Sequence, residues 1–278
     1  MLKVGFVGLG TIGKPIAVNI LKAGFDLMVF DSRRGAVKAL ARLGAKAAHS
    51  CREVGQHGKV IGVAVVDDGQ VEEVVMGKGG VVEGARPGTI IAIHSTISPK
   101  TARKLAEQAG KKGVHVIDAP VSGGAKGARE KALCYMVGGD KRLLKKCRGL
   151  FSASASHIFH MGGIGMGTAA KLAVQVVVCV HMLAAHEAAL LCQESGLPFS
   201  TLQELLRVSS GQSFVVDHWL QRFKRPSDAR AVRRRRTEVF YKSLSPALDL
   251  ARVLGISLPG AALAQRLLPQ IMGIEGTK

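Results

Sequence analysis

The stretch GFVGLGTIG, residues 5–13, constrains the fold of this chain more than any other. It has the spacing G-x-G-x-x-G at Gly8, Gly10 and Gly13, directly after a strand-like apolar run and at the start of a helical pattern. In a βαβ unit, such glycines allow a tight turn, a close approach of a pyrophosphate to the backbone, and close packing of helix on strand. A glycine-rich turn without a ligand is the alternative. We expect a dinucleotide to bind here, through Gly8, Leu9, Gly10, Thr11, Ile12 and Gly13.

The second predicted strand ends at Asp31, about twenty residues beyond the glycines, where a carboxylate accepts hydrogen bonds from the adenosine ribose. A carboxylate repels a 2′-phosphate, so Asp31 favours NAD over NADP. The neighbouring arginines, Arg33 and Arg34, keep NADP open, because a guanidinium binds phosphate well. We expect Asp31, Ser32 and Arg33 to contact this end of the cofactor.

Apolar runs and helical patterns alternate through the first half of the chain, which is typical of parallel βαβ units. Beyond about residue 162 the patterns are helical throughout. We therefore predict an α/β chain: an N-terminal Rossmann domain with a doubly wound, mainly parallel sheet over 1–162, and an all-α domain over 163–278. A long interdomain helix is predicted over about 165–195. The strands are expected at 2–8, 25–31, 59–66, 88–95, 113–120 and 135–139.

Composition narrows the class of protein. Apolar residues make up 47% of the 278 residues, as in a globular chain, and the five cysteines form no C-x-x-C pair. Free thiols favour the cytoplasm, and no targeting segment is visible. The apolar run 172–192 is long enough to span a membrane, but polar residues interrupt or flank it, so a buried helix is preferred.

The chain is strongly basic, with a formal charge of +19 and a dense cationic run over 222–236. Such charge favours acidic partners. Only 4% of residues are aromatic, which leaves few platforms for stacking bases. We interpret the arginines at 233–236 as a solvated helix face and do not expect nucleic acid as a partner. The histidines form no cluster with metal-ligand spacing, so no metal site is expected.

Further blocks follow the glycine turn in order: HSTISP (94–99), DAPVSGG (118–124), MVGGD (136–140), GMGTAAKLAVQ (165–175) and VFYKSLSPALDLA (239–251). Together with GFVGLGTIGKPIAVNILKAG, they resemble the β-hydroxyacid dehydrogenase family, which includes 3-hydroxyisobutyrate dehydrogenase and tartronate semialdehyde reductase. The blocks cover nearly the whole chain. The resemblance implies an NAD(P)-dependent oxidoreductase that interconverts a small β-hydroxyacid and its semialdehyde, as a homodimer or homotetramer.

The resemblance also implies roles for individual residues. Lys171 matches the family's catalytic lysine, and burial of its amine would lower its pKa and suit it to proton exchange. Ser122, Gly123 and Gly124 match the site of the substrate carboxylate, for which a hydroxyl and turn amides are suitable donors. The remaining matches are Gln175 for the substrate, and Val65, Val66, Thr96 and Lys242 for the cofactor.

The chain departs from the family at two of these places. Gln175 stands where asparagine is usual, which adds a methylene to the amide side chain. Ser243 replaces the aspartate that usually follows the lysine at 242. Two other functions remain open: a dinucleotide-binding, dehydrogenase-like protein with a basic nucleic-acid-binding surface, and an imine or glyoxylate-type reductase on the same fold. Lys171 argues against an imine reductase.

Overall fold

The structure, a computed structural model, describes residues 1–218 and 229–274. Contacts within the chain divide it into two compact units, Met1–Lys171 and Leu172–Lys278.

The first unit is built on one nine-stranded sheet. Its strands are β1 Lys3–Val7, β2 Asp26–Phe30, β3 Lys46–Ala47, β4 Val60–Val63, β5 Ile90–Ile93, β6 His115–Asp118, β7 Val121–Ser122, β8 Leu133–Gly138 and β9 Ala155–Gly162. The order β3-β2-β1-β4-β5-β6 is parallel throughout, with β8 antiparallel to both β6 and β7, and β9 parallel to β8. The predicted fold, a Rossmann domain followed by helices, is confirmed.

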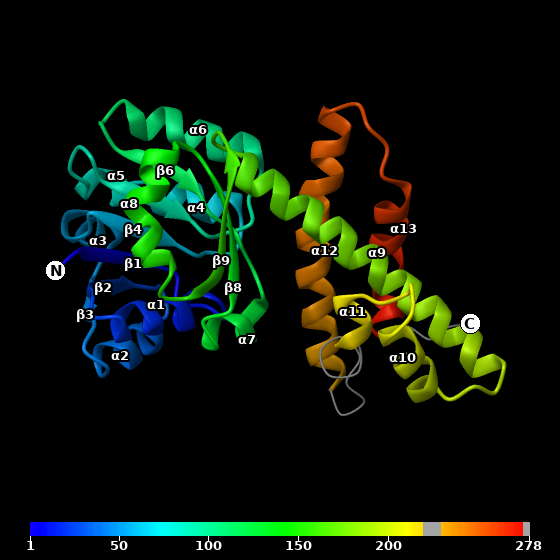
Figure 1. Cartoon of the computed structure of the whole chain (residues 1–278). Coiled ribbons are helices and arrows are strands. Elements are labelled where there is room, and N and C mark those ends of the chain that lie inside the picture. The colour runs from blue at the N-terminus through cyan, green and yellow to red at the C-terminus, as the bar shows by residue number, and fades with distance from the viewer. Residues whose placement is uncertain (219–228, 275–278) are drawn as a thin grey trace. The chain divides into compact units, whose positions relative to one another are not determined.

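Helices cover both faces of this sheet (Figure 1). One face packs against α1 Gly13–Lys22, α2 Arg34–Ala41, α7 Gly124–Arg129 and α8 Lys141–Phe151. The other packs against α3 Cys51–His57, α4 Asp68–Met76, α5 Val81–Gly84 and α6 Pro99–Gly110. Because both faces are covered, strands such as β4 and β5 are buried along their whole length and are apolar without alternation.

Helix starts follow local capping chemistry. Ser98 precedes α6 and its Oγ accepts the Thr101 N–H at 3.0 Å, with Pro99 in the first turn. Asp67 caps α4 in the same way, through the Gln70 N–H at 3.0 Å. These caps fix where the chain leaves the carboxyl ends of β4 and β5, the edge at which a Rossmann fold binds its ligand.

The second unit is helical in the part that the structure describes. It contains the remainder of α9 Met166–Glu194, then α10 Phe199–Arg207, α11 Phe214–Asp217, α12 Arg230–Val253 and α13 Pro259–Ile271. Its core combines apolar side chains from α9, α11, α12 and α13. By length and composition α9 is apolar enough to cross a membrane, and 44% of its most apolar window is buried inside the protein. The pattern VVDHWLQRF, which predicts a helix over 215–223, lies mostly outside the described residues.

The arginine run at the start of α12 is less solvated than predicted. Arg234 is exposed, and its Nε lies 3.6 Å from Glu238 Oε1. Arg233, however, is half-buried, and its Nε is shielded from solvent without a hydrogen-bond partner among the described residues. The solvated face predicted for 233–236 thus holds at Arg234, whereas Arg233 is only partly solvated.

Candidate active site

The glycine turn between β1 and α1 has the geometry that a dinucleotide requires. Gly8 has φ +92°, and a Cβ there would lie 2.3 Å from the Ala64 carbonyl oxygen. At Gly13 a Cβ would lie 2.0 Å from the Gly8 oxygen, so α1 can approach β1 this closely only with glycine. A Cβ at Gly10 would meet nothing within 4 Å. Gly8 and Gly13 are thus needed for packing, whereas Gly10 leaves space beside the backbone for a pyrophosphate.

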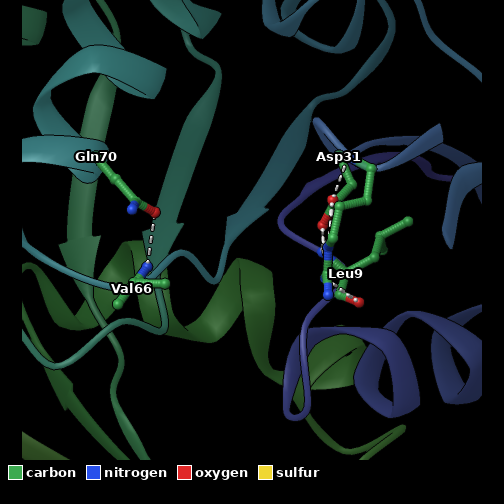
Figure 2. Close-up of polar contacts among 5 residues, drawn as sticks. Leu9, Asp31, Val66 and Gln70 are labelled. Atoms are coloured by element: carbon green, nitrogen blue, oxygen red, sulfur yellow. Dashed lines mark hydrogen bonds and ion pairs between the residues drawn. The ribbon is translucent and has the colours of Figure 1, made fainter.

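Asp31, just after β2, is held against this turn. Its Oδ2 accepts the Leu9 N–H at 2.6 Å, and Arg33 donates to Oδ1 from its backbone N–H at 2.8 Å and from Nε at 3.1 Å (Figure 2). Burial raises the pKa of Asp31. The hydrogen bonds from Arg33 and Leu9 lower that pKa by a larger amount in total, so the carboxyl titrates below its ordinary range. Asp31 is therefore an ionised acceptor at the edge of the glycine turn.

The Arg33 side chain also contacts the glycine turn, at Leu9. Its Nη2 donates to the Leu9 carbonyl oxygen at 3.1 Å, yet 64% of its side chain remains exposed. Ser32 and Arg34 are exposed beside it. The predicted ribose acceptor and a solvent-accessible guanidinium thus occupy one turn, a combination that suits either a ribose hydroxyl or a 2′-phosphate.

The loops after β4 and β5 are joined by a serine that the sequence reasoning missed. Ser95 Oγ accepts the Val65 N–H at 2.9 Å and donates to the Val65 carbonyl oxygen at 2.8 Å. The Val66 N–H donates to Gln70 Oε1 at 3.2 Å, and the Val66 side chain is 62% exposed (Figure 2). Thr96, half-buried, directly follows Ser95. Three of the predicted cofactor residues therefore lie on two loops that are fastened to each other.

Ser122, Gly123 and Gly124 form a sharp turn from β7 into α7. Gly123 has φ +123° and Gly124 has φ +63°, both in the region that favours glycine. Ser122 ends β7 and is paired in antiparallel register with Cys134 of β8. Cross-strand partners point to the same face of a sheet, so the Ser122 and Cys134 side chains lie side by side.

The start of α9 is anchored by Asp118, at the end of β6. The Gly165 N–H donates to Asp118 Oδ1 at 2.7 Å and the Thr168 N–H donates to Oδ2 at 2.6 Å, and the aspartate is fully buried. Both carboxylate oxygens therefore satisfy free N–H groups at the helix start, where negative charge is also favoured by the helix dipole. Sequence reasoning quoted Asp118 within DAPVSGG but gave it no role.

A backbone contact reinforces this anchor. A Cβ at Gly167, in the first turn of α9, would lie 2.4 Å from the Met136 carbonyl oxygen. A Cβ at Gly138, at the end of β8, would lie 2.7 Å from the Gly167 nitrogen. The first turn of α9 therefore lies directly on the end of β8, at a distance that only glycines permit.

Lys171 lies one turn beyond Thr168 on this anchored segment and is only 9% exposed. Its ammonium acts electrostatically on the Cys134 thiol: burial raises the pKa of Cys134, and the positive charge of Lys171 lowers it in part. Cys134 is the register partner of Ser122, so the thiol on which Lys171 acts lies beside the Ser122–Gly124 turn.

Gln175 and Lys242 belong to the second unit. Gln175 is half-buried, one turn after Lys171 along α9, and Lys242 is exposed on α12. Ser243, beside it, donates from Oγ to the Val239 carbonyl oxygen at 2.7 Å, so its hydroxyl bonds to its own helix. The roles of Gln175 and Lys242 remain predictions.

Comparison with known proteins identifies both parts of the chain. The profile of the NAD-binding domain of 6-phosphogluconate dehydrogenase matches residues 3–163, and a profile described as NAD-binding of NADP-dependent 3-hydroxyisobutyrate dehydrogenase matches 165–277. The 2-(hydroxymethyl)glutarate dehydrogenase of Eubacterium barkeri is 33% identical over 266 residues, which are 96% of this chain and 88% of that protein. The 2-hydroxy-3-oxopropionate reductase of Escherichia coli is 34% identical over 267 residues, 96% and 90% of the two chains.

A solved structure agrees. The 3-hydroxyisobutyrate dehydrogenase of Mycobacterium tuberculosis with L-serine is 28% identical, with a TM-score of 0.85 over 98% of this chain and 94% of that one. The fold, the glycine turn and these relatives together define an NAD(P)-dependent oxidoreductase of small hydroxyacids. Within that class, the chain belongs to the β-hydroxyacid dehydrogenase family.

Proposed function

We propose that the chain interconverts a small β-hydroxyacid, similar to 3-hydroxyisobutyrate, and its semialdehyde, with Lys171 as the general acid and base. The observation that supports this proposal is a buried lysine, Lys171, that acts electrostatically on Cys134, the cross-strand partner of Ser122. A lysine near the Ser122 turn suits a substrate whose carboxylate binds to that turn and whose hydroxyl oxygen gains or loses a proton.

The chain's residues divide the work as follows. The Ser122 hydroxyl and the amides of Gly123 and Gly124 hold the substrate carboxylate. Lys171 removes the proton of the substrate hydroxyl in oxidation and returns it to the oxygen in reduction. NAD(P), when bound, supplies or accepts the hydride. Its phosphates are assigned to the turn of Gly8–Gly13 and its ribose to Asp31, because those groups have the spacing and charge that a dinucleotide needs.

Residues of the second unit complete the proposal. Gln175 is assigned to orient the substrate and Lys242 to contact the cofactor, as the family resemblance implies. The glutamine side chain is longer by one methylene than the usual asparagine, so we expect the pocket to favour a short substrate.

We also propose that the enzyme is a homodimer or homotetramer that works in the cytoplasm. Exposed apolar side chains along the second unit, among them Val177, Leu191 and Leu263, support self-association. The cysteines, all of them free thiols, support a reducing compartment.

The test is turnover by wild type and Lys171→Ala, followed through the absorbance of reduced nicotinamide with a panel of semialdehydes and β-hydroxyacids. Wild type should turn over at least one of them, and Lys171→Ala should lose about two orders of magnitude or more in kcat. Lys126→Ala, which removes an exposed lysine from α7, is the matched control and should retain full activity. Equal rates in wild type and Lys171→Ala would exclude the catalytic role.

A further inference from the structure

A groove of about 530 Å³ runs along the outer side of α1. It is lined by Gly10 and Thr11 of the glycine turn, which precede α1, by Lys22 at the end of α1, and by Arg129 of α7. The two helices are tied together beneath it, where Asn19, itself buried, donates from Nδ2 to the Ala128 carbonyl oxygen at 2.7 Å. The groove therefore has a fixed floor.

Its lining is cationic. Lys14, Lys22 and Arg129 contribute three positive charges, and no lining residue in the described part of the chain carries a carboxylate. None of these three side chains forms an ion pair with another described residue. Three uncompensated cations in a concave surface concentrate anions there, because low-dielectric walls focus the field.

The groove also has an apolar stretch between its ends, made by Pro15 and Val18. The ten residues of α1, Gly13–Lys22, span about 15 Å at a rise of 1.5 Å per residue. Lys22 therefore stands well away from the glycine turn to which the cofactor phosphates are assigned, and Arg129 follows Ala128, whose carbonyl oxygen is held by Asn19, one turn before Lys22. The far end can be occupied while the cofactor is bound.

We propose that this groove binds a phosphate monoester with an apolar body, with its phosphate on Lys22 and Arg129 and its body on Val18 and Pro15. A phosphate dianion matches the guanidinium fork of Arg129 better than a single carboxylate does, because it offers more charge and more acceptor oxygens. The volume accommodates a phosphate and one ring system, within the usual range of ligand pockets. This site is separate from the proposed catalytic centre and does not depend on it.

Phenyl phosphate is the probe, titrated calorimetrically at low ionic strength into protein saturated with NADH. Wild type should bind it in the presence of NADH, and added salt should weaken the binding because the attraction is electrostatic. The double variant Lys22→Ala/Arg129→Ala should bind phenyl phosphate about tenfold more weakly or worse. Lys126→Ala removes an exposed α7 cation that does not line the groove, and should leave the affinity unchanged.

NADH binding by each variant checks that the fold is intact, and should be unaltered because neither substituted residue touches the glycine turn. Three results would overturn the proposal. These are no binding to wild type, displacement of phenyl phosphate by NADH, which would place it in the cofactor cleft, and equal affinity in the double variant and wild type.

Discussion

Replacing Asp118 with asparagine tests whether this buried carboxylate holds the start of α9 in place. The carboxylate accepts the Gly165 N–H at 2.7 Å and the Thr168 N–H at 2.6 Å, one on each oxygen. Asparagine keeps one acceptor and turns an NH2 group toward the other N–H. One charge-assisted hydrogen bond, worth about 1.5–3 kcal/mol, is lost, and a buried donor is left without an acceptor. We expect the free energy of unfolding of the first unit to fall by about 3 kcal/mol.

For a unit of this size, 1 kcal/mol corresponds to about 2–4 °C in Tm, so the expected decrease is about 6–12 °C, measured by circular dichroism. Activity should fall as well, at temperatures where the variant is fully folded. Lys171 follows Thr168 by one turn, and a shift of about 1 Å in a reacting group can cost on the order of a hundredfold in rate. The loss should appear in kcat, whereas affinity for NADH should be retained.

Asp140→Asn is the matched control, because Asp140 also caps a helix, α8, through the Arg142 N–H at 2.7 Å, but its side chain is 39% exposed. Water can satisfy the donors that this substitution releases, so its effect on Tm should be much smaller and its kcat unchanged. If the two variants lose the same stability, or if Asp118→Asn keeps the wild-type kcat, the anchoring role of Asp118 is refuted.

Three further predictions rest on separate features of the first unit. Arg33→Ala should weaken use of NADPH more than use of NADH, because the exposed guanidinium beside Asp31 is the cation available to a 2′-phosphate; equal losses in kcat/KM for the two cofactors would contradict this. Lys131 has φ +58°, so Lys131→Gly should raise the free energy of unfolding by about 1 kcal/mol in urea titrations, and Lys131→Ala, which stays strained, should give no gain. Burial lowers the pKa of His94 to about 4 from its usual 6.5, so on acidification the imidazole is protonated in the unfolded chain before it is protonated in the folded one. The free energy of unfolding should therefore fall by about 3 kcal/mol as the pH drops from 6.5 to 4. His94→Leu should lose that part of the pH dependence, and a variant with the wild-type pH profile would contradict this role of His94.

The sequence predicted the elements whose signals are local. The apolar runs of β1, β4 and β5 are buried along all or nearly all of their length, so they are continuous and easily recognised. By contrast, β3 and β7 have two residues each and depend on a neighbouring strand for their definition. Strand β9 is mostly exposed, and its sequence, ASHIFHMG, mixes polar and apolar residues without the continuous apolar run of a buried strand. These strands are defined by hydrogen bonds to neighbouring strands, and a local sequence pattern does not predict such pairing.

The same division applies to the candidate site. The roles of the three glycines follow from their spacing, because each is required by the backbone geometry of a single βαβ unit. The contact of Asp118 with the start of α9 joins residues 47 and 50 positions apart, and the proximity of Lys171 to Cys134 is likewise set by the packing of α9 on β8. Neither could be read from spacing. Family resemblance supplied Lys171 and Ser122, but not the packing around them.

The backbone contact between Gly138 and Gly167 has a consequence for anyone who wishes to redesign this enzyme. No side chain fits on either residue, so most variants substituted at Gly138 or Gly167 in a random library should be inactive. The half-buried Cys134, two strand residues upstream of Met136, already carries a side chain and is the strand partner of Ser122. Directed evolution toward new hydroxyacids should therefore keep the glycine junction constant and diversify Cys134 and Gln175.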